Sequence, residues 1–349
     1  MTALEGACAR ECERLLREGS GERAGERAGE RWAIGVDLGG TKVAVAAVSS
    51  AGRLAGRNET RTLKGVPPEE SLAAMVQLAE QAVCDAGIER TAISGVGVGA
   101  PGPLNSATGI IHFAPNLGWE NVAIGPYFAR NFPGIPVKLE NDANAAALGE
   151  YRFGAGRGLR HMVYITVSTG VGGGLILDGK LYTGASGGAG EIGHIPVQRE
   201  GGPRCGCGHY GCLEAVSSGT AIARMAREHV ASGGGGLLAE MAQAQAQAQG
   251  RVGAAAVGAA ARQGDPAASA ILKTAFTYLG GAMATVVNLL NPEAIIVGGG
   301  VSALWDLMLP YLQHEIDSGS VAGFQNKVQI RRAELGRDTG IYGAGALFV

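Results

Sequence analysis

The chain has 349 residues, of which 59 are glycine, 5% are aromatic and 17% are charged. Its 46% apolar fraction excludes global disorder, and the glycines lack the Gly-X-Y period of collagen. A formal net charge of −2 argues against a nucleic-acid or anionic-membrane partner, and no apolar run reaches the roughly 18 residues of a membrane span. The N-terminus contains acidic residues and no apolar segment typical of a secretory signal, so we expect a cytoplasmic protein.

Residues 1–32 differ in composition from the rest of the chain. They contain the charged repeat GERAGERAGER, which predicts a disordered N-terminal extension. Order is expected to begin at Trp32, where residues 33–37 predict a buried strand, LGGT a turn and residues 42–48 a returning strand. An amphipathic helix over 68–87 follows.

The second half of the chain repeats this plan about 130 residues later. Residues 162–168 predict a strand, TGVGGG a turn, and LILDG a returning strand. Alternating strands and helices predict an α/β protein, and two similar halves predict two domains with a cleft between them. We place a small N-terminal domain at 33–140, completed by the C-terminal helix at 337–349, and a large domain at 141–336.

Three later segments have clear local signals. Residues 231–250 are of low complexity, which predicts a mobile surface loop that leads into a helix. Asp265-Pro266 is a typical helix start, and this helix should extend to Leu290 because Pro292 cannot continue it. Residues 339–348 predict a terminal helix.

Three glycine turns follow predicted strands and are candidate phosphate sites. Adjacent glycines let backbone N–H groups face an anion, a threonine adds a hydroxyl donor, and an aspartate at the strand end can hold Mg²⁺. Each turn can also be an ordinary tight turn. The candidate residues are Asp37, Gly39, Gly40, Thr41 and Lys42 in the first turn, Thr169 and Gly170 in the second, and Gly298, Gly299 and Gly300 in the third.

A fourth glycine segment, Gly97–Gly102, matches G-x-G-x-x-G after a strand. A dinucleotide site needs a helix to begin there, but Pro103 and Asn105 follow at once without a helical pattern. We therefore interpret this segment as a loop lining the cleft. The chain also lacks the G-x-x-x-x-G-K-[ST] motif of P-loop enzymes.

Glu140-Asn141-Asp142 ends a predicted strand and precedes an alanine-rich helix. An aspartate in this place can accept a proton from a hydroxyl group during phosphoryl transfer, and the neighbouring amide can hold a second hydroxyl. The alternative role of the aspartate is to cap the helix, and the two roles can coexist because a helix N-terminus keeps a carboxylate ionised.

Three cysteines lie within eight residues, at Cys205, Cys207 and Cys212. With one histidine they would form a closed Cys₃His site for structural Zn²⁺, and His194 and His209 compete for the fourth position. The alternative is a set of reduced cysteines without metal. Glu191 and Glu214 flank the cluster, either as surface acids or as contacts for sugar hydroxyls.

These motifs together resemble the ROK family of bacterial sugar kinases and repressors, from about Ala33 to Val349. The resemblance implies an actin-like (RNase H-like) ATPase fold with ATP and sugar in the cleft. It implies that Asp142 is the catalytic base and that His194, not His209, completes the zinc site. It further implies sugar contacts from Asn116, Asn141, Asp142, Glu191, His194 and Glu214.

The implied reaction is transfer of the ATP γ-phosphoryl group, with Mg²⁺, to the 6-hydroxyl of a hexose, in the first place glucose. Fructose, mannose, N-acetylmannosamine or N-acetylglucosamine are alternative substrates. A sugar-responsive transcriptional repressor is the alternative from another class, disfavoured because the first 32 residues show no helix-turn-helix pattern. Resemblance to the family favours a homodimer or a tetramer.

Overall fold

The computed structural model describes residues 30–250, 252–323 and 327–349, which fall into two compact units. The first unit comprises residues 30–154, Gly184–Gly188 and Arg337–Val349, and the second comprises Ala155–Thr183 and Ala189–Gly336. The division falls after Gly154, whereas the sequence placed the domain boundary at residue 140. The prediction of an extension over residues 1–32 lies almost entirely outside the described residues.

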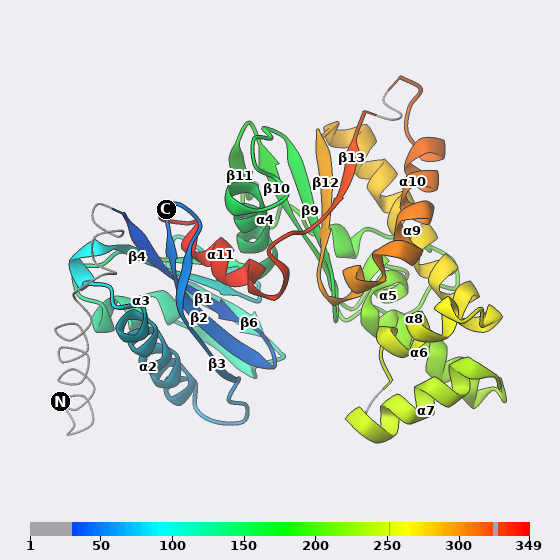
Figure 1. The fold of residues 1–349 in the computed structure, drawn as a ribbon, viewed down its shortest axis with the longest axis horizontal. Coiled ribbons are helices and arrows are strands. Elements are labelled where there is room, and N and C mark those ends of the chain that lie inside the picture. The colour runs from blue at the N-terminus through cyan, green and yellow to red at the C-terminus, as the bar shows by residue number, and fades with distance from the viewer. Residues whose placement is uncertain (1–29, 251, 324–326) are drawn as a thin grey trace. The chain divides into compact units, whose positions relative to one another are not determined.

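A five-stranded sheet forms the centre of the first unit, in the order β3-β2-β1-β4-β8 (Figure 1). Its strands are β1 (Trp32–Leu38), β2 (Lys42–Ser49), β3 (Leu54–Arg61), β4 (Ile93–Ala100) and β8 (Val137–Asn141). The predicted hairpin is the antiparallel pair of β1 and β2, while β4 is parallel to both β1 and β8. A second sheet contains β5 (Leu104–Asn105), β6 (Ile110–Ala114) and β7 (Trp119–Val122). The candidate dinucleotide segment is therefore the end of a strand and a loop, as predicted, and no helix begins there.

The two faces of the five-stranded sheet have separate cores because side chains alternate along a strand. On one face, Ile34 and Val36 pack in a core that includes Met75 of α2 (Pro68–Ala86). On the other face, Ala33 packs with Ile341 of α11 (Thr339–Gly345). A Cβ atom on Gly35 would lie 2.1 Å from the Ile341 carbonyl oxygen, so glycine is required for the close approach of α11 to β1.

Two further helices belong to the first unit, α3 (Ile124–Asn131) and α4 (Asp142–Phe153). A Cβ atom on Gly149 of α4 would lie 2.8 Å from the backbone nitrogen of Gly343 in α11, which shows how closely these helices pack. This contact explains why α4 belongs to the first unit although the sequence assigned it to the large domain.

The second unit repeats the sheet of the first strand for strand, in the order β11-β10-β9-β12-β13. Its strands are β9 (Met162–Val167), β10 (Val171–Leu177), β11 (Lys180–Tyr182), β12 (Ala294–Gly298) and β13 (Gln329–Arg332). The pairs β9–β10 and β10–β11 are antiparallel and the pairs β9–β12 and β12–β13 are parallel, as are their counterparts in the first unit. The duplication expected from the two hairpins is therefore a duplication of the whole sheet.

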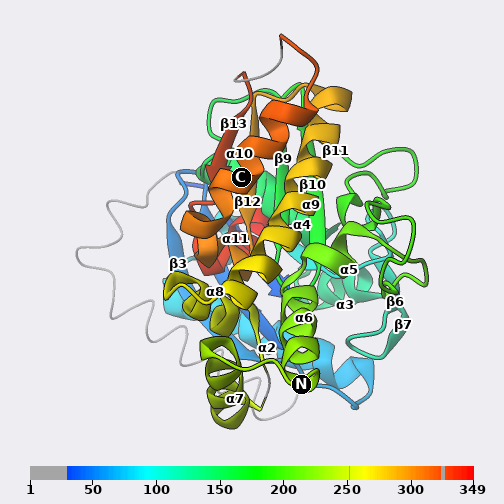
Figure 2. The ribbon, with the colours of Figure 1, turned by 90° about the vertical axis from the view of Figure 1, so that its right-hand side faces the viewer.

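Helices cover the sheet of the second unit. They are α5 (Leu213–Ser217), α6 (Gly219–Ala231), α7 (Leu237–Gln249), α8 (Ala254–Arg262), α9 (Pro266–Leu290) and α10 (Trp305–Gly319). Helices α9 and α10 lie side by side next to the sheet, as Figure 2 shows, and share its apolar core. Helix α9 is long and apolar enough to span a membrane by length and composition, but 56% of its most apolar window is buried inside the protein. Its bounds confirm the predicted start after Asp265 and end at Leu290.

The prediction for residues 231–250 is wrong over most of its length, because Leu237–Gln249 form α7. Alanine and glutamine are good helix formers, and Leu238 and Ala242 are buried. The carboxylate of Asp265 accepts the Leu238 N–H at 2.9 Å and the Ala268 N–H at 2.9 Å. One buried side chain thus caps both α7 and α9 and attaches the low-complexity segment to the core.

We predict that Asp265→Ala destabilises the protein by about 1–2 kcal/mol for each helix that loses its cap. Burial raises the pKa of Asp265, but the N–H groups of Ala268 and Leu238 outweigh it and leave the pKa below its ordinary value. This stabilisation is therefore present at neutral pH and is lost as the pH falls below about 3.9, the ordinary pKa of an aspartate. Urea unfolding measured at pH 7 and pH 3 checks both statements.

Glu240→Ala provides the matched control, because Glu240 is an exposed carboxylate in the first turn of α7. Its loss should change the free energy of unfolding by less than about 0.5 kcal/mol. Equal effects of the two substitutions would contradict the assignment of Asp265 as a double cap.

Candidate functional site

The predicted site residues form two groups, one in each unit. The first unit holds Asp37, Gly39, Gly40, Thr41, Lys42, Asn116, Asn141 and Asp142. The second unit holds Thr169, Gly170, Glu191, His194, Cys205, Cys207, Cys212, Glu214, Gly298, Gly299 and Gly300.

The polar residues of the first unit gather at one edge of its sheet. Asp37 of β1 pairs in register with Gly99 of β4, which in turn pairs with Glu140 of β8. Because these strands are parallel, their carboxyl ends meet at the same edge, where ligands bind in open α/β sheets. Gly40 lies in contact with Asn116, since a Cβ atom on Gly40 would be 3.4 Å from the Asn116 Cβ. The structure thus brings the first glycine turn and a predicted sugar contact together.

The Asp37 carboxylate lies against the first turn of α11. A Cβ atom on Gly340 would be 2.4 Å from the Asp37 Cγ. Burial raises the pKa of Asp37 to about 6, and the charges of Lys42 and Arg57 offset part of this effect. Among the described residues no hydrogen bond is donated to this carboxylate. A nearby cation stabilises the ionised form of a partly buried carboxylate such as this one. This property fits a Mg²⁺ ligand.

Lys42 of the first turn contacts a carboxylate in this structure. Its Nζ donates to the Glu59 Oε2 at 3.2 Å, and Arg57 donates to the same oxygen at 2.7 Å. Both Lys42 and Glu59 are 37% exposed, so the pair is open to solvent and to exchange with a phosphate.

Asn141 and Asp142 stand where β8 ends and α4 begins, and the N-cap position considered for the aspartate is occupied by Asn141. The Asn141 Oδ1 accepts the N–H groups of Ala143 at 2.9 Å and Asn144 at 3.2 Å, so Asn141 is the N-cap. Asp142 is the first helical residue, and its Oδ1 accepts the Ala143 N–H at 2.8 Å. Because the Asn141 oxygen is used in capping, its NH₂ group is the part available to a ligand.

Glu140, the residue before them, was given no function by the sequence. Its side chain is buried, and its Oε1 accepts the Asn141 N–H at 2.9 Å and the Asn144 side-chain amide at 3.0 Å. Glu140 therefore holds the turn that carries Asn141 and Asp142. The sequence offered no signal for this role, because in the strand Val137–Asn141 Glu140 falls on the same side as the exposed Lys138, and its partners cannot be identified from the sequence.

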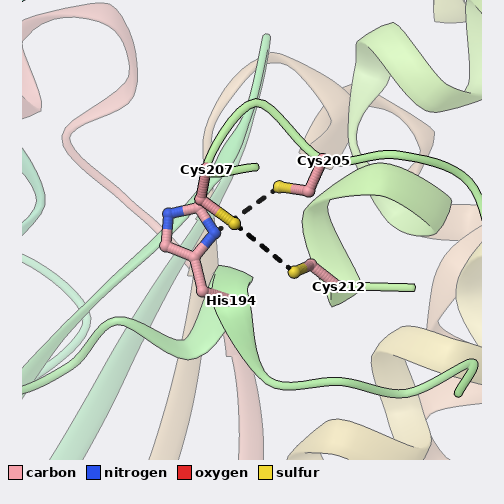
Figure 3. Close-up of side chains that lie close together, drawn as sticks. All are labelled: His194, Cys205, Cys207 and Cys212. Atoms are coloured by element: carbon pink, nitrogen blue, oxygen red, sulfur yellow. Dashed lines mark hydrogen bonds between the residues drawn. The ribbon is translucent and has the colours of Figure 1, made fainter. Parts of the chain in front are cut away.

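In the second unit, His194 and the three cysteines point toward one another (Figure 3). One ligand atom from each of these four residues lies within 4.8 Å of the other three. The Cys205 Sγ is 3.7 Å from the His194 Nδ1, and the Cys207 Sγ is 3.6 Å from the Cys212 Sγ. His209 Nδ1 lies 3.5 Å from the Cys207 Sγ but is not part of this group of four.

The donor set fits zinc in both chemistry and spacing. A tetrahedron with metal–sulfur bonds of about 2.3 Å has edges of about 3.8 Å, close to the two distances above. The His209 backbone N–H lowers the pKa of Cys207 to about 6, whereas burial raises the pKa of Cys205 to about 12 and that of Cys212. A cation is therefore needed to stabilise all three thiolates together.

The orientation of His194 leaves one ring nitrogen for other contacts. Its Nδ1 faces the cysteine cluster, while its Nε2 lies 3.8 Å from the Glu191 Oε2. Glu214 follows Cys212 closely in α5, and its Oε2 accepts the Val171 N–H at 3.1 Å. A Cβ atom on Gly170 would be 2.3 Å from this Glu214 oxygen, so Glu214 packs directly on the second glycine turn.

The second and third glycine turns lie at one edge of the five-stranded sheet of the second unit. The register pairs Gly298 at the end of β12 with Thr166 of β9, just before the turn that contains Thr169 and Gly170. The Thr169 carbonyl accepts the Thr220 hydroxyl at 2.7 Å, which ties this turn to the start of α6. The third turn leads into a 3₁₀ turn, η3 (Gly300–Leu304), before α10 begins.

Comparison with known proteins decides the family. The sequence profile of the ROK family matches residues 33–349. The chain belongs to the ROK family. It is 37% identical to a glucokinase of Halalkalibacterium halodurans over 317 residues, which is 91% of this chain and 94% of that protein.

Two solved structures of ROK proteins have the same fold. One is a ROK family glucokinase of Streptomyces griseus, solved in complex with glucose and AMPPNP. It gives a TM-score of 0.75 at 34% identity, and the match covers 91% of this chain and 99% of the glucokinase chain. A ROK family transcriptional regulator, a homologue of the E. coli MLC protein, gives a TM-score of 0.79 at 28% identity. The match covers 91% of this chain and 77% of the regulator. These relatives confirm the predicted duplicated, actin-like ATPase fold.

Proposed function

We propose that this ROK protein is an ATP-dependent hexose kinase that transfers the γ-phosphoryl group to the 6-hydroxyl of glucose. The observation that carries the proposal is the Asn141–Asp142 turn, where a carboxylate stands at a helix N-terminus beside an amide whose NH₂ group is available. The likeness to a glucokinase solved with glucose and AMPPNP supports both substrates.

Asp142 acts as the general base in this proposal. It accepts the proton of the sugar hydroxyl as that oxygen attacks the γ-phosphorus, and the N-terminus of α4 favours its ionised form. The Asn141 NH₂ group and Asn116 hold further hydroxyls. Since the transition state of phosphoryl transfer is loose, the main task of these groups is to position the sugar.

The glycine turns bind ATP in this proposal. Backbone N–H groups of Gly39 and Gly40 face the phosphates, Thr41 donates a hydroxyl, and Lys42 exchanges Glu59 for a phosphate oxygen. Mg²⁺, when bound, neutralises charge on the phosphates. Asp37 would hold it, usually through water. In the second unit, Thr169, Gly170 and the Gly298–Gly300 turn face the nucleotide.

The cluster of His194, Cys205, Cys207 and Cys212 holds structural zinc in this proposal. Four protein ligands leave no open position for a reacting water, so the metal shapes the segment and does not take part in the reaction. Ligation through Nδ1 fixes the His194 ring so that its Nε2 N–H, beside Glu191, faces a sugar hydroxyl. Glu214 contributes a further sugar contact. The expected cytoplasmic location and dimeric or tetrameric state remain predictions.

The substrate is tested first with a coupled assay of ADP release on purified full-length protein. We expect turnover with ATP and glucose, and a lower kcat/KM with fructose, mannose, N-acetylmannosamine and N-acetylglucosamine. A higher kcat/KM with one of the other sugars would keep the kinase and change its substrate. No turnover with any sugar would contradict the kinase and favour the sugar-responsive regulator.

The base is tested with Asp142→Asn, which removes the proton acceptor and keeps the shape of the side chain. We predict that kcat falls by about a hundredfold or more, since general base catalysis contributes about 10²–10⁴. Glucose binding measured by titration calorimetry should stay within about threefold of the unsubstituted protein. Asp178→Asn, at an exposed turn of the second unit, is the control and should keep full activity. A near-normal kcat in Asp142→Asn would rule out Asp142 as the base.

The zinc site is tested by elemental analysis. We predict one zinc per chain, and its loss in Cys207→Ser and Cys212→Ser, together with a lower free energy of unfolding. Cys84→Ser is the matched control, because Cys84 is a buried cysteine of the first unit, outside the cluster, and its substitution should not change the zinc content. An active protein without metal would contradict the assignment.

A further inference from the structure

Three charged residues of the first unit have no part in the proposed reaction, although they surround two residues that do. Arg57 and Glu59 lie on β3, and Asp338 immediately precedes α11. Their neighbours are Asp37 and Lys42, the proposed Mg²⁺ and phosphate contacts. The charges of Lys42 and of all three residues act on the Asp37 carboxylate. Together these five side chains carry three negative and two positive charges.

Arg57 connects β3 to the segment before α11. Its Nε donates to the Asp338 Oδ1 at 2.7 Å, and its Nη2 donates to the Glu59 Oε2 at 2.7 Å. Arg57 and Asp338 are each only 20% exposed, so their attraction is less screened than that of an open surface pair. The planar guanidinium fixes both bonds in one geometry, which a lysine could not do.

The Arg57–Asp338 pair ties the residue immediately before α11 to β3. Gly340 stands two residues after Asp338 and touches the Asp37 carboxylate, since a Cβ atom there would be 2.4 Å from the Asp37 Cγ. No hydrogen bond from a described residue orients this carboxylate. The carboxylate packs against α11, and Arg57 adds a charged link between β3 and the start of this helix to the contacts that α11 makes with β1 and α4.

We propose that Arg57 and Asp338 are positioning residues that hold α11 against Asp37 and thereby set the Asp37 carboxylate for the divalent cation of the nucleotide complex. This inference rests on the proposed function only in taking Asp37 as the residue that holds Mg²⁺. Glu59 has a separate effect: it engages both Arg57 and Lys42, and it releases Lys42 when a phosphate takes its place.

The test measures nucleotide binding and not only turnover. ATP affinity is determined by titration calorimetry on the full chain, once with Mg²⁺ and once with EDTA, and the ratio of the two affinities is the Mg²⁺ increment. We predict that Arg57→Gln and Asp338→Asn each reduce this increment about tenfold, as expected for loss of one charge-assisted hydrogen bond, with ATP affinity in EDTA unchanged. In turnover, KM for MgATP rises while KM for glucose stays the same.

Two comparisons separate positioning from other effects. Arg61→Gln removes the same charge from the same strand without touching Asp338, and should leave the increment unchanged. The double variant Arg57→Gln/Asp338→Asn should be no worse than either single variant, because both remove one interaction. If Arg57→Gln does not fold, Arg57→Lys takes its place, since it keeps the charge and loses the two-bond geometry.

The outcomes distinguish this inference from the proposed function. An unchanged Mg²⁺ increment in both Arg57→Gln and Asp338→Asn would overturn it, as would an equal loss in Arg61→Gln. Loss of stability in urea with an unchanged increment would also overturn it and leave the pair a purely structural role. If Asp37→Asn keeps the increment, the cation is held elsewhere and the inference fails. Failure of the proposed function is seen separately, as absence of phosphoryl transfer in the unsubstituted protein.

Discussion

The close contact between α11 and β1 is the constraint on which the first unit depends. The last residues of the chain cover the face of a sheet whose first strand begins at Trp32, and Gly35 makes this approach possible. The same helix packs on α4, whose first residue is Asp142, and touches Asp37 through Gly340. The proposed base and the proposed cation ligand are therefore both supported by a helix formed at the opposite end of the sequence.

The cysteine cluster imposes a comparable constraint on the second unit. Burial raises the pKa of Cys205 and that of Cys212, so a bound cation would be needed to favour their thiolate forms. In the proposed zinc site the His194 Nδ1 would be a ligand, and its Nε2 would stay beside Glu191. Glu214 extends this order to the second glycine turn through the Val171 N–H. In the proposed function a structural metal would thus orient sugar contacts without taking part in the reaction.

Local signals in the sequence were sufficient for much of the fold. Gly87 ends α2 in the left-handed conformation and Asp265-Pro266 begins α9, because cap residues act within one helical turn. Long-range partners could not be predicted in this way. Arg57 and Asp338 are 281 residues apart, and no single-sequence pattern pairs them. The α7 segment failed for another reason: its low complexity suggested a loop, while Asp265, outside the segment, provides its cap.

The duplicated sheets carry different side chains at matching positions of their two hairpins. The last residue pairs of the two hairpins are Leu38 with Val43 and Val167 with Val171, so Asp37 in the first corresponds to Thr166 in the second. A carboxylate carries a full negative charge and attracts a divalent cation more strongly than the neutral hydroxyl of a threonine does. With the same backbone plan, this difference is the reason that the proposed function gives the cation to the first hairpin and a direct nucleotide contact to the second.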